Sequence, residues 1–391
     1  MNSPLPPPGA PLQHYVSAAP FDPYTVETMT DAQSKLHLAS QWRLMWWKFK
    51  RHRAAYWCGV FLVLMYGSTL ISEFIAPYNL HTRNVEVIHS PPQSIHLFHD
   101  GAFIGPFVYG RDSKLNMDKM QREYTDNKTT IYPLRFFCHG ETYKFWGIWK
   151  ADLHLVCPAS DGQFFLLGTD RLGRDVLSRI IYGARISLTI GLIGVIFSFT
   201  LGIIIGGLAG YHGGWLDLCV QRVIEVLQSI PSIPLWMALA AIMPVSWSPL
   251  IVYFAITFIL GLLDWTGLAR AVRSKLFSLR EEEYVLAAQL MGASTSRIIG
   301  RHLVPGFISH LIATATLAIP GMILGETALS FLGLGLRQPI TSWGILLTEA
   351  KNVNVVALYP WLLFPMVPVI LVIIAFNFLG DGLRDAADPY N

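Results

Sequence analysis

The stretch Glu281–Pro305 reads EEEYVLAAQLMGASTSRIIGRHLVP and lies between two apolar runs that are each long enough to cross a bilayer. Its residues are polar and helix-forming, unlike those of its neighbours. Ser278 and Glu281 have the spacing of a capping box, which predicts a helix that begins near residue 279. Gly292 is predicted to end this helix, because glycine readily adopts the left-handed conformation found just past a helix C-terminus. A second short helix is predicted between Gly292 and the next span.

The first of these predicted helices carries a modest apolar stripe. Tyr284, Ala288 and Met291 recur at helical spacing, and the small side chain of Ala287 beside them leaves that part of the helix surface flat. A short helix with small residues on its exposed face fits a groove in another protein. The pattern favours a docking helix. An ordinary loop with two helical turns is the simpler alternative, and spacing alone leaves both open.

The composition is that of a polytopic membrane protein. Of the 391 residues, 52% are hydrophobic and only 14% are charged, and the mean hydropathy is +0.42. A soluble chain of this length would need far more charge to cover its surface. The net charge of +3 is too small to indicate nucleic-acid binding. Residues 1–38 are proline-rich and polar and lack the apolar core of a secretory signal, so we expect a disordered cytoplasmic tail.

Six apolar runs predict six transmembrane helices. The first, residues 54–76, follows a basic, tryptophan-containing segment at 39–53 that is typical of an interfacial helix. The other five are expected in a core of residues 184–381, at about 187–209, 218–243, 250–268, 307–330 and 359–379. Arginines and lysines crowd the near side of the first span and the loop 269–306, so both are predicted to be cytoplasmic, and with them the C-terminal residues 382–391.

Residues 77–180 form a large polar excursion between the first two spans. Fragments at 94–98 and 152–156 alternate as strands do, so we expect a small β-rich domain outside the membrane. The last part, Leu167–Leu188, carries four arginines and suggests an interfacial helix at the outer surface. Cys138 and Cys157 both lie in the excursion, and on the outer side of a membrane they are candidates for a disulfide. A zinc site is disfavoured because neither cysteine belongs to a CxxC pair.

Three residues inside the spans stand out. Pro231 and Pro234 predict a kink or break in the third span, and we take them as candidates for the translocation pathway. Glu326 is an acid in the fifth span, where insertion scales assign a cost of about 2.5–3.5 kcal/mol, so it should face protein or water. It is a candidate pathway or gate residue, with a structural hydrogen bond to a neighbouring helix as the alternative.

Sequence signatures of catalysis are missing. The motifs GxxxxGK[ST], HExxH and GxSxG are absent, so we expect no nucleotide hydrolysis, no metal centre and no other catalytic residues in this chain.

The opening stretch resembles the EAA coupling loop of bacterial ABC import permeases, through Ala287-Ala288, Gly292 and, thirteen residues on, Pro305. The resemblance narrows to the peptide and nickel importer branch through Glu283-Tyr284-Val285, Gly292-Ala293-Ser294, Arg297-Ile298 and His302. Two further segments, Leu167–Leu188 and 380–386, also resemble that branch, so the likeness extends over roughly residues 165–391.

The stretch departs from the general motif at three positions. Leu286 stands where the motif has its glutamate, His302 stands at an isoleucine position, and Val304 replaces the leucine before the proline. The peptide branch usually carries its acid earlier, at the position of Glu283, so we interpret the departure as specific to the branch.

The resemblance implies a fold and a function. The fold would be all-α and polytopic, with the six transmembrane helices of a type I ABC importer permease and a small β-rich periplasmic insertion between the first and second. The function would be that of a non-catalytic permease subunit, of the second (C-type) kind, for short peptides in a bacterial inner membrane. Nickel complexes or oligosaccharides are the alternative cargo, and a secondary transporter is the alternative from another class.

The resemblance also implies partners and contact residues. The partners are a second homologous permease, two subunits that bind and use ATP, a periplasmic substrate-binding protein and the lipid membrane. This chain itself would bind no cofactor. The residues implied to couple it to an ATPase subunit are Glu283, Tyr284, Ala287, Ala288, Gly292, Arg297, His302 and Pro305.

Overall fold

The computed structural model describes residues 40–117, 121–157 and 162–387. The predicted tail at 1–38 lies outside the described residues. The chain divides after Leu44 into a short N-terminal unit and a larger unit, Met45–Asn391, which contains the spans and the strands. Helix α2 (Gln41–Arg51) begins before this division and covers most of the segment that the sequence predicts as an interfacial helix.

The larger unit is mostly helical. Four helical segments of the described residues are long and apolar enough to cross a membrane, and their main helices are α5 (Val176–His212), α8 (Pro249–Leu279), α11 (Ile308–Leu332) and α14 (Met366–Ala387). The protein is therefore a multi-pass membrane protein.

A fifth crossing is broken. Helices α6 (Gly214–Ser229) and α7 (Ser232–Ala241) meet the same criteria only as a pair, and they are bent by 88° at the break between them. Pro231 lies in the break and Pro234 in the first turn of α7, within the span that the sequence predicts as kinked or broken. Proline removes a backbone donor and clashes with the preceding turn, so it favours such a break.

The first predicted span corresponds to α3 (Arg53–Leu70) followed by the short α4 (Ser72–Ile75). Helix α3 packs against α14, where Tyr66 meets Phe376 edge to face. It does not reach the hydropathy of the other spans, because Arg53 and several polar side chains lie within its 18 residues. The count of six transmembrane helices therefore stays a prediction.

Two helices run past their predicted spans. Helix α5 begins at Val176, well before residue 187, and its 37 residues measure about 55 Å at ~1.5 Å per residue, longer than a hydrocarbon core of about 30 Å. The surface helix expected at Leu167–Leu188 is therefore not a separate element, because its second half continues into the span. Helix α8 ends at Leu279 instead of near residue 268.

Helices α5 and α8 pack closely against each other along their length. Gly206 permits the closest approach, since a Cβ at this position would lie 2.3 Å from the carbonyl oxygen of Ala269. Small residues let two helix backbones approach in this way inside a membrane. Further along this helix pair, a core cluster includes Leu188, Ile256, Leu260 and Ile323, all fully buried.

Between α4 and α5, the described residues form five strands in two antiparallel sheets. Strands β1 (His96–His99), β2 (Ala102–Asn116) and β3 (Gln121–Pro133) form one sheet in that order. Strands β4 (Arg135–Phe145) and β5 (Trp149–Cys157) form a separate hairpin. A 3-10 turn, η1 (Val85–Val87), precedes the strands.

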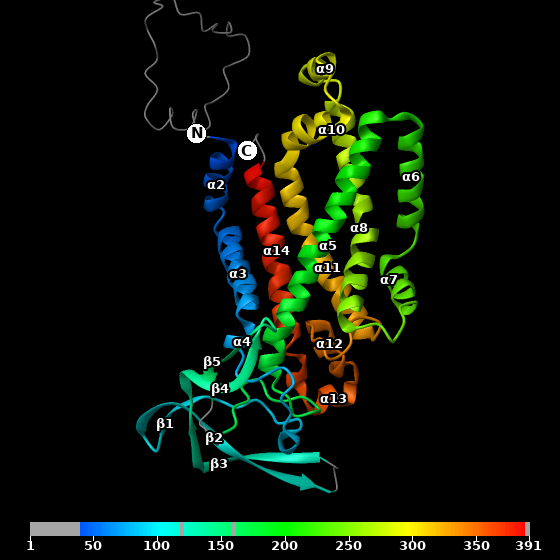
Figure 1. Ribbon diagram of the computed structural model, residues 1–391. Coiled ribbons are helices and arrows are strands. Elements are labelled where there is room, and N and C mark those ends of the chain that lie inside the picture. Colours follow the sequence, from blue (N-terminus) through cyan, green and yellow to red (C-terminus); the bar gives the residue numbers. More distant parts are fainter. Residues whose placement is uncertain (1–39, 118–120, 158–161, 388–391) are drawn as a thin grey trace, which may run out of the picture. The chain divides into compact units, whose positions relative to one another are not determined.

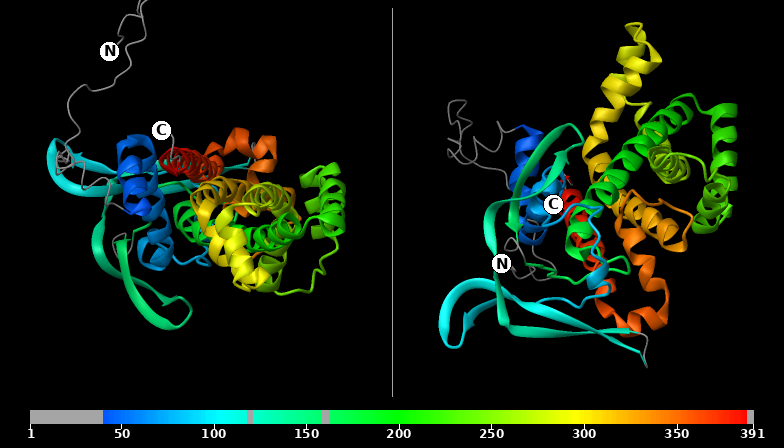
Figure 2. Two further views of the ribbon diagram at one scale, coloured as in Figure 1. Left: turned by 90° about the horizontal axis from the view of Figure 1, so that it is seen from above. Right: turned by 60° about the horizontal axis from the view of Figure 1, so that its bottom comes forward.

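The strands and the opening stretch of the sequence lie at opposite ends of the spans (Figure 1). We call these the strand end and the loop end. The strand end also contains α12 (Trp343–Leu347), η4 (Glu349–Lys351), α13 (Val353–Leu358) and η5 (Pro360–Leu363). The views in Figure 2 place α3 and α6 on opposite sides of the helices α5, α8 and α11.

The loop end consists of four short elements between α8 and α11. They are α9 (Glu283–Leu290), α10 (Thr295–Arg297), the π-helical turn η2 (Ile298–Leu303) and the 3-10 turn η3 (Val304–Phe307). Of these four elements, α9 projects furthest from the spans (Figures 1 and 2).

Candidate functional site

Helix α9 begins four residues later than the sequence predicts. The apolar face of α8 stays packed as far as Leu276, so α8 continues through Ser278 and leaves no room for a capping box there. Glu282 is the N-cap of α9, and its side chain makes no capping hydrogen bond. Gly292 follows the C-cap with a φ of +76°, in the left-handed region, and its N–H donates to the carbonyl oxygen of Gln289 at 2.9 Å.

The buried face of α9 differs from the predicted stripe. Val285 and Ala288 are almost fully buried, and they pack in a cluster that includes Leu276, Ile298 and Leu303. Tyr284 and Met291, expected on the same face as Ala288, are instead exposed. The reason is that α9 is short and lies on the turns that follow it, so residues three apart, 285 and 288, define the inward face.

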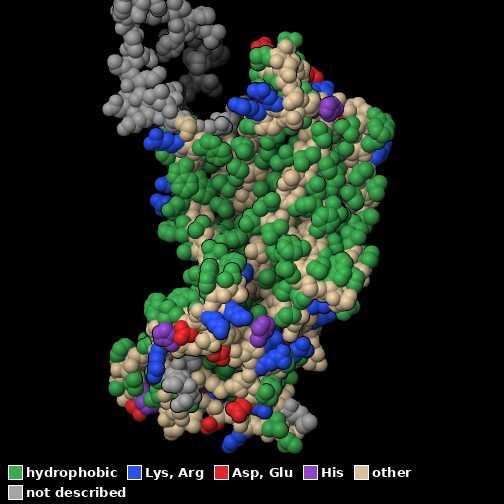
Figure 3. Space-filling view, in the orientation of Figure 1, with side chains coloured by type: hydrophobic (Ala, Val, Ile, Leu, Met, Phe, Trp, Pro, Cys, Tyr) green, Lys and Arg blue, Asp and Glu red, His purple; other side chains and the backbone are tan. Residues whose placement is uncertain are grey.

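The outward face of α9 is apolar. It presents Leu290 with 90% and Met291 with 82% of the residue surface exposed, while Tyr284, Leu286 and Ala287 are exposed beside them. We call these five residues the α9 knob. Figure 3 shows hydrophobic side chains at this tip with arginine and lysine side chains gathered below them. An exposed apolar surface of this kind, rimmed by charge, is typical of a protein–protein contact.

Few polar contacts hold α9 to the spans. The Gln289 side-chain amide donates to the Tyr211 hydroxyl at 3.1 Å. The Arg280 guanidinium stacks over the Phe277 ring at 4.1 Å and donates to the Tyr211 carbonyl at 3.5 Å. The Arg280 contacts join the ends of α5 and α8 to each other, so α9 itself is joined to the spans by one side-chain hydrogen bond and one small apolar cluster.

The remaining predicted coupling residues follow α9 in the chain. Arg297 is exposed at the end of α10, His302 is half-buried in η2, and Pro305 is exposed in η3. In the part of the chain that the structure describes, no hydrogen bond or ion pair joins any of the three to α9. An ion pair that the sequence did not indicate, between Arg273 and Asp217, links α8 to α6 at the same end. No motif marks Asp217, because its partner lies 56 residues away.

Comparisons with known proteins identify the family of this chain. The family model "Binding-protein-dependent transport system inner membrane component" matches residues 202–390, and the "N-terminal TM domain of oligopeptide transport permease C" matches residues 40–92. The dipeptide transport system permease protein DppC of Bacillus subtilis is 40% identical over 232 residues, which are 59% of this chain and 70% of that protein. The chain belongs to the family of peptide ABC importer permeases of the C type.

Other relatives show the same range of similarity. The oligopeptide transport system permease protein OppC of Haemophilus influenzae is 41% identical over 235 residues, 60% of this chain and 73% of that protein. A putative peptide permease protein of Brucella suis is 38% identical over 252 residues, 63% of this chain and 81% of that protein. A solved MetNI methionine ABC transporter in an inward-facing conformation aligns at a TM-score of 0.42 with 18% identity, over 54% of this chain and 97% of the transporter chain.

Glu326 of this permease is fully buried in α11 and fully hydrogen-bonded. The hydroxyls of Ser342 and Ser330 donate to its carboxylate at 2.6 and 2.8 Å, and that of Ser187 at 3.3 Å. These contacts join α11 to α5 and to the N-cap of α12. They support a structural role for Glu326; its role as a gate, like that of Pro231 and Pro234, stays a prediction. No motif in the sequence marks these serines, because Ser187 and Ser342 lie 139 and 16 residues from Glu326.

The strand end contains a buried ion network. Asp170 accepts from the Arg174 Nε at 2.7 Å and from the Arg179 Nη1, and all three side chains are at most 6% exposed. Glu349 lies 3.8 Å from both arginines and 3.6 Å from Arg171. The sequence predicted that these arginines would lie at the membrane surface. Instead, Arg174 and Arg179 are buried, because Asp170 and Glu349 supply the opposite charge.

A second carboxyl group is buried at the start of α5. Asp175 is the N-cap and accepts from the Ser178 N–H at 2.7 Å and from its hydroxyl at 2.6 Å. Burial raises the pKa of Asp175 to about 6, although these hydrogen bonds oppose the shift. Burial also raises the pKa of Glu349, and the nearby Asp170 carboxylate adds to this shift.

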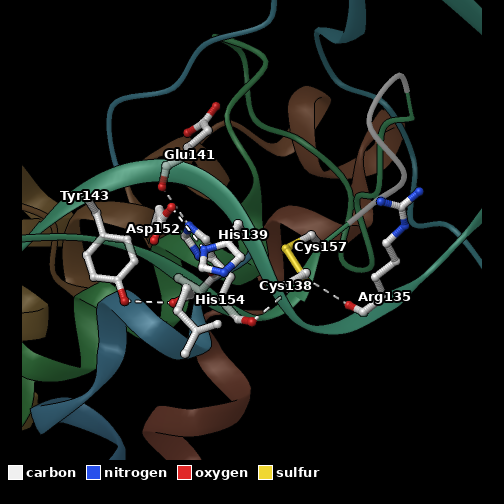
Figure 4. Close-up of a disulfide and its surroundings, with 10 residues drawn as sticks. Arg135, Cys138, His139, Glu141, Tyr143, Asp152, His154 and Cys157 are labelled. Carbon is white, nitrogen blue, oxygen red and sulfur yellow. Dashed lines mark hydrogen bonds and ion pairs between the residues drawn. A yellow bond between two sulfur atoms is a disulfide. The ribbon is translucent and has the colours of Figure 1, made fainter.

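A disulfide joins β4 to β5 between Cys138 and Cys157 (Figure 4). These are the two cysteines whose pairing the sequence leaves open. The fully buried His154 lies beside the bond, with its Nδ1 2.7 Å from the Ala76 carbonyl oxygen and its Nε2 2.9 Å from that of Glu141. His154 thus joins the hairpin to the end of α4. Among the described residues, no group of three or more His, Cys, Asp or Glu side chains is placed to hold a metal ion.

Proposed function

We propose that this chain is the C-type permease subunit of an ATP-driven importer that moves short peptides across a bacterial inner membrane. The names of its relatives support this cargo, since they are dipeptide, oligopeptide and putative peptide permeases. The family model named for binding-protein-dependent transport supports a periplasmic substrate-binding protein as partner. A second homologous permease and two ATP-binding subunits complete the proposed assembly, and ATP is used by those subunits alone.

The proposed orientation places the loop end in the cytoplasm and the strand end outside. Six arginines and lysines between residues 269 and 306 support a cytoplasmic loop end. The Cys138–Cys157 disulfide supports an oxidising compartment for the strand end. With α3 as the first span and the α6–α7 pair as the third, the permease has six spans with both termini in the cytoplasm.

The α9 knob is the observation that carries the coupling role. Leu290 and Met291 are too exposed for a surface that faces only water, and α9 rests on the spans through Val285 and Ala288. A groove on an ATPase subunit would cover the knob, as grooves cover short amphipathic helices. Closure of the ATPase subunits on ATP would move α9 and, through η2 and η3, α11. Arg297 and Glu283 would contribute polar contacts at the rim.

A cross-link tests this role. The structure directs the cysteine to position 287, because Ala287 is exposed whereas its neighbour Ala288 is buried. The free cysteines Cys58 and Cys219 are first replaced by serine. Ala287→Cys should cross-link to a cysteine in the groove of a co-expressed ATPase subunit, with a yield that changes when ATP is added.

The matched control is Ala288→Cys, which should cross-link poorly because its side chain points into the cluster beneath α9. Equal yields at the two positions, or no cross-link at 287 in an assembled complex, would exclude the knob as the docking surface.

The cargo needs a separate measurement. The complete transporter in proteoliposomes should take up a labelled dipeptide only with ATP and the binding protein. Unlabelled peptides should compete, whereas nickel complexes and oligosaccharides should not. If only nickel complexes or only oligosaccharides competed, that compound and not a peptide would be the cargo.

A further inference from the structure

The turn between β4 and β5 has an unusual sequence, Lys144-Phe145-Trp146-Gly147-Ile148-Trp149-Lys150. Phe145 pairs with Trp149 across the hairpin, and Lys144 pairs with Lys150 directly behind them. The tip is therefore a cluster of large apolar side chains with a lysine on each side. Neither the proposed peptide transport nor the coupling loop uses this cluster.

The backbone of the turn is adapted to present these side chains. Trp146 and Gly147 have φ values of +51° and +74°, the left-handed pair of a tight hairpin turn closed by a 3.0 Å hydrogen bond from the Ile148 N–H to the Phe145 carbonyl. Asparagine and glycine adopt this conformation readily, but a bulky residue such as tryptophan does so at a cost. A tryptophan in this position indicates that the side chain matters more than the ease of the turn.

The tip is left uncovered by the rest of the described chain. Ile148 is 70% exposed and Trp149 65%, and Trp146 is 48% exposed. At roughly 25 cal/mol per Å² of apolar surface, leaving such side chains in water forgoes a large part of their burial energy. Near the start of the same strand, Phe137 is 68% exposed, and its ring lies 6.1 Å from that of Phe74 in α4.

The position of the tip along the spans is fixed by Trp146. Its indole N–H donates to the carbonyl oxygen of Leu70, the last residue of α3, at 2.9 Å. Its backbone N–H donates to the Glu73 carboxylate at 3.3 Å, and the Arg185 guanidinium lies 4.5 Å from its ring. The hairpin tip therefore lies at the level where α3 ends.

Helix α3 has an exposed apolar surface up to that level. Val63 is 72%, Leu64 66% and Leu70 54% exposed, as expected for side chains that face lipid. Beyond Leu70 the polar network of Glu73 and Arg185 begins, with bonds of 2.6 and 2.7 Å. The aromatic tip is thus continuous with the apolar surface of α3 at its boundary with polar groups.

From this continuity we infer that the β4–β5 tip is an anchor that inserts into the lipid headgroup region at the strand end of the membrane. Tryptophan and phenylalanine favour the headgroup region. There an apolar ring can contact acyl chains while the polar indole N–H of tryptophan still reaches water. Lys144 and Lys150, both exposed, are placed to reach lipid phosphates on either side of the tip. The bilayer, together with His154 and the disulfide, would then fix the height of the sheets above the spans.

The β2–β3 hairpin provides a contrast within the same segment. Leu115 near its tip is 60% exposed, close to the exposure of Ile148 and Trp149. However, it is flanked by Lys114 and Asn116, and it pairs with Arg122 of β3. Position 115 therefore serves as an exposed apolar control that is expected to face water.

The test measures the depth of the tip in the complete transporter reconstituted in lipid nanodiscs. With Cys58 and Cys219 replaced by serine and the disulfide kept oxidised, Ile148→Cys or Leu115→Cys carries the small fluorophore NBD. Doxyl groups on the lipid acyl chains quench from the membrane, and iodide quenches from water. We expect the label at 148 to be quenched several-fold more by doxyl lipid than the label at 115, with the opposite order for iodide.

Two results would overturn the inference. Strong iodide quenching at 148 without doxyl quenching would show that the tip stands in water. Protection from both quenchers would show that a protein, such as the second permease or a binding protein, covers it. A label at Trp149→Cys must give the same result as the label at 148, which guards against local misfolding. Peptide uptake by the same preparation is measured separately, so a failed anchor and a failed peptide importer are distinguishable.

Discussion

The two ends of this permease are held together in opposite ways. At the strand end, Asp170 contacts two buried arginines, so that charges from three segments interlock. At the loop end, α9 rests on the spans through Val285 and Ala288 and a single side-chain hydrogen bond from Gln289. A buried polar network requires one geometry, whereas a small apolar contact lets a short helix shift as a unit. The comparison indicates a rigid strand end and a movable loop end.

Removing the central acid of the network should have the largest effect. Asp170→Ala leaves Arg174 and Arg179 buried without their closest partner, and breaking a buried pair in this way typically costs about 3–5 kcal/mol. We expect a strongly lowered unfolding temperature and a low yield of folded subunit in detergent, both measured by fluorescence-detected size exclusion with heating.

The control for this variant is an ion pair with an exposed acid. Arg280 and Glu281 lie 3.5 Å apart at the loop end and the Glu281 side chain is 76% exposed, so Glu281→Ala should cost about 0–1 kcal/mol. If Asp170→Ala were as stable as Glu281→Ala, the strand end would not be the rigid end.

The second effect depends on pH. The pKa of Asp175 is raised from 3.8 to about 6, so the folded state binds its proton more tightly than the unfolded state does. Its contribution to stability therefore falls as pH rises from about 4 to about 6, by roughly 3 kcal/mol at about 1.4 kcal/mol per pKa unit. Asp175→Asn keeps a cap acceptor and should remove this part of the pH dependence, measured as unfolding temperatures between pH 4 and 7.

Asp100→Asn is the matched control, because the Asp100 side chain is 91% exposed. It should keep the pH dependence of the unsubstituted protein. If the stability of Asp175→Asn depended on pH just as steeply, the dependence would come from other groups, such as Glu349, whose pKa is also raised by burial.

The two ends also differ in how far their structure could be predicted from the sequence. At the loop end, Gly292 correctly marks the end of a helix, since the signal is local and depends on backbone conformation. The start of α9 and its inward face were predicted wrongly, because packing of Leu276 and Ile298 from other elements decides both.

At the strand end, the sequence placed four arginines at a membrane surface, but two of them are buried. Their closest partner, Asp170, lies only four residues before Arg174. The second acid, Glu349, follows Arg174 by 175 residues and Arg179 by 170, beyond the reach of any spacing rule. Helical spans are easier to predict because their apolar length is local and sufficient. The α6–α7 break is predictable for the same reason, since Pro231 breaks the helix locally, through its own backbone conformation.

The third effect concerns the helix pair that connects the two ends. Gly206→Ala places a Cβ 2.3 Å from the Ala269 carbonyl oxygen, so α5 and α8 must separate, at a cost of about 1–3 kcal/mol. Gly267→Ala on α8 has no neighbour within 4 Å among the described residues and should be neutral or slightly stabilising. Unfolding temperatures of the two variants measure the difference, and equal values would contradict close packing at Gly206.

The substitution with the smallest expected effect on stability should have the clearest effect on function. Gly292→Val forces a β-branched residue into a φ of +76°, which costs roughly 1–3 kcal/mol locally. Because α9 is held by few contacts, the strain should shift α9 rather than unfold the spans. We expect normal membrane insertion and an almost unchanged unfolding temperature, but peptide uptake uncoupled from ATP hydrolysis in proteoliposomes.

Gly300→Val separates this effect from bulk alone. Gly300 lies in η2 with an ordinary φ and no described neighbour within 4 Å of an added Cβ, so valine fits there without forcing a left-handed backbone. Uptake close to that of the unsubstituted transporter is expected. Normal uptake by Gly292→Val would show that the angle of α9 is not critical for coupling. Loss of insertion in that variant would show instead that the loop end is as integral to the fold as the strand end, and the contrast between them would fail.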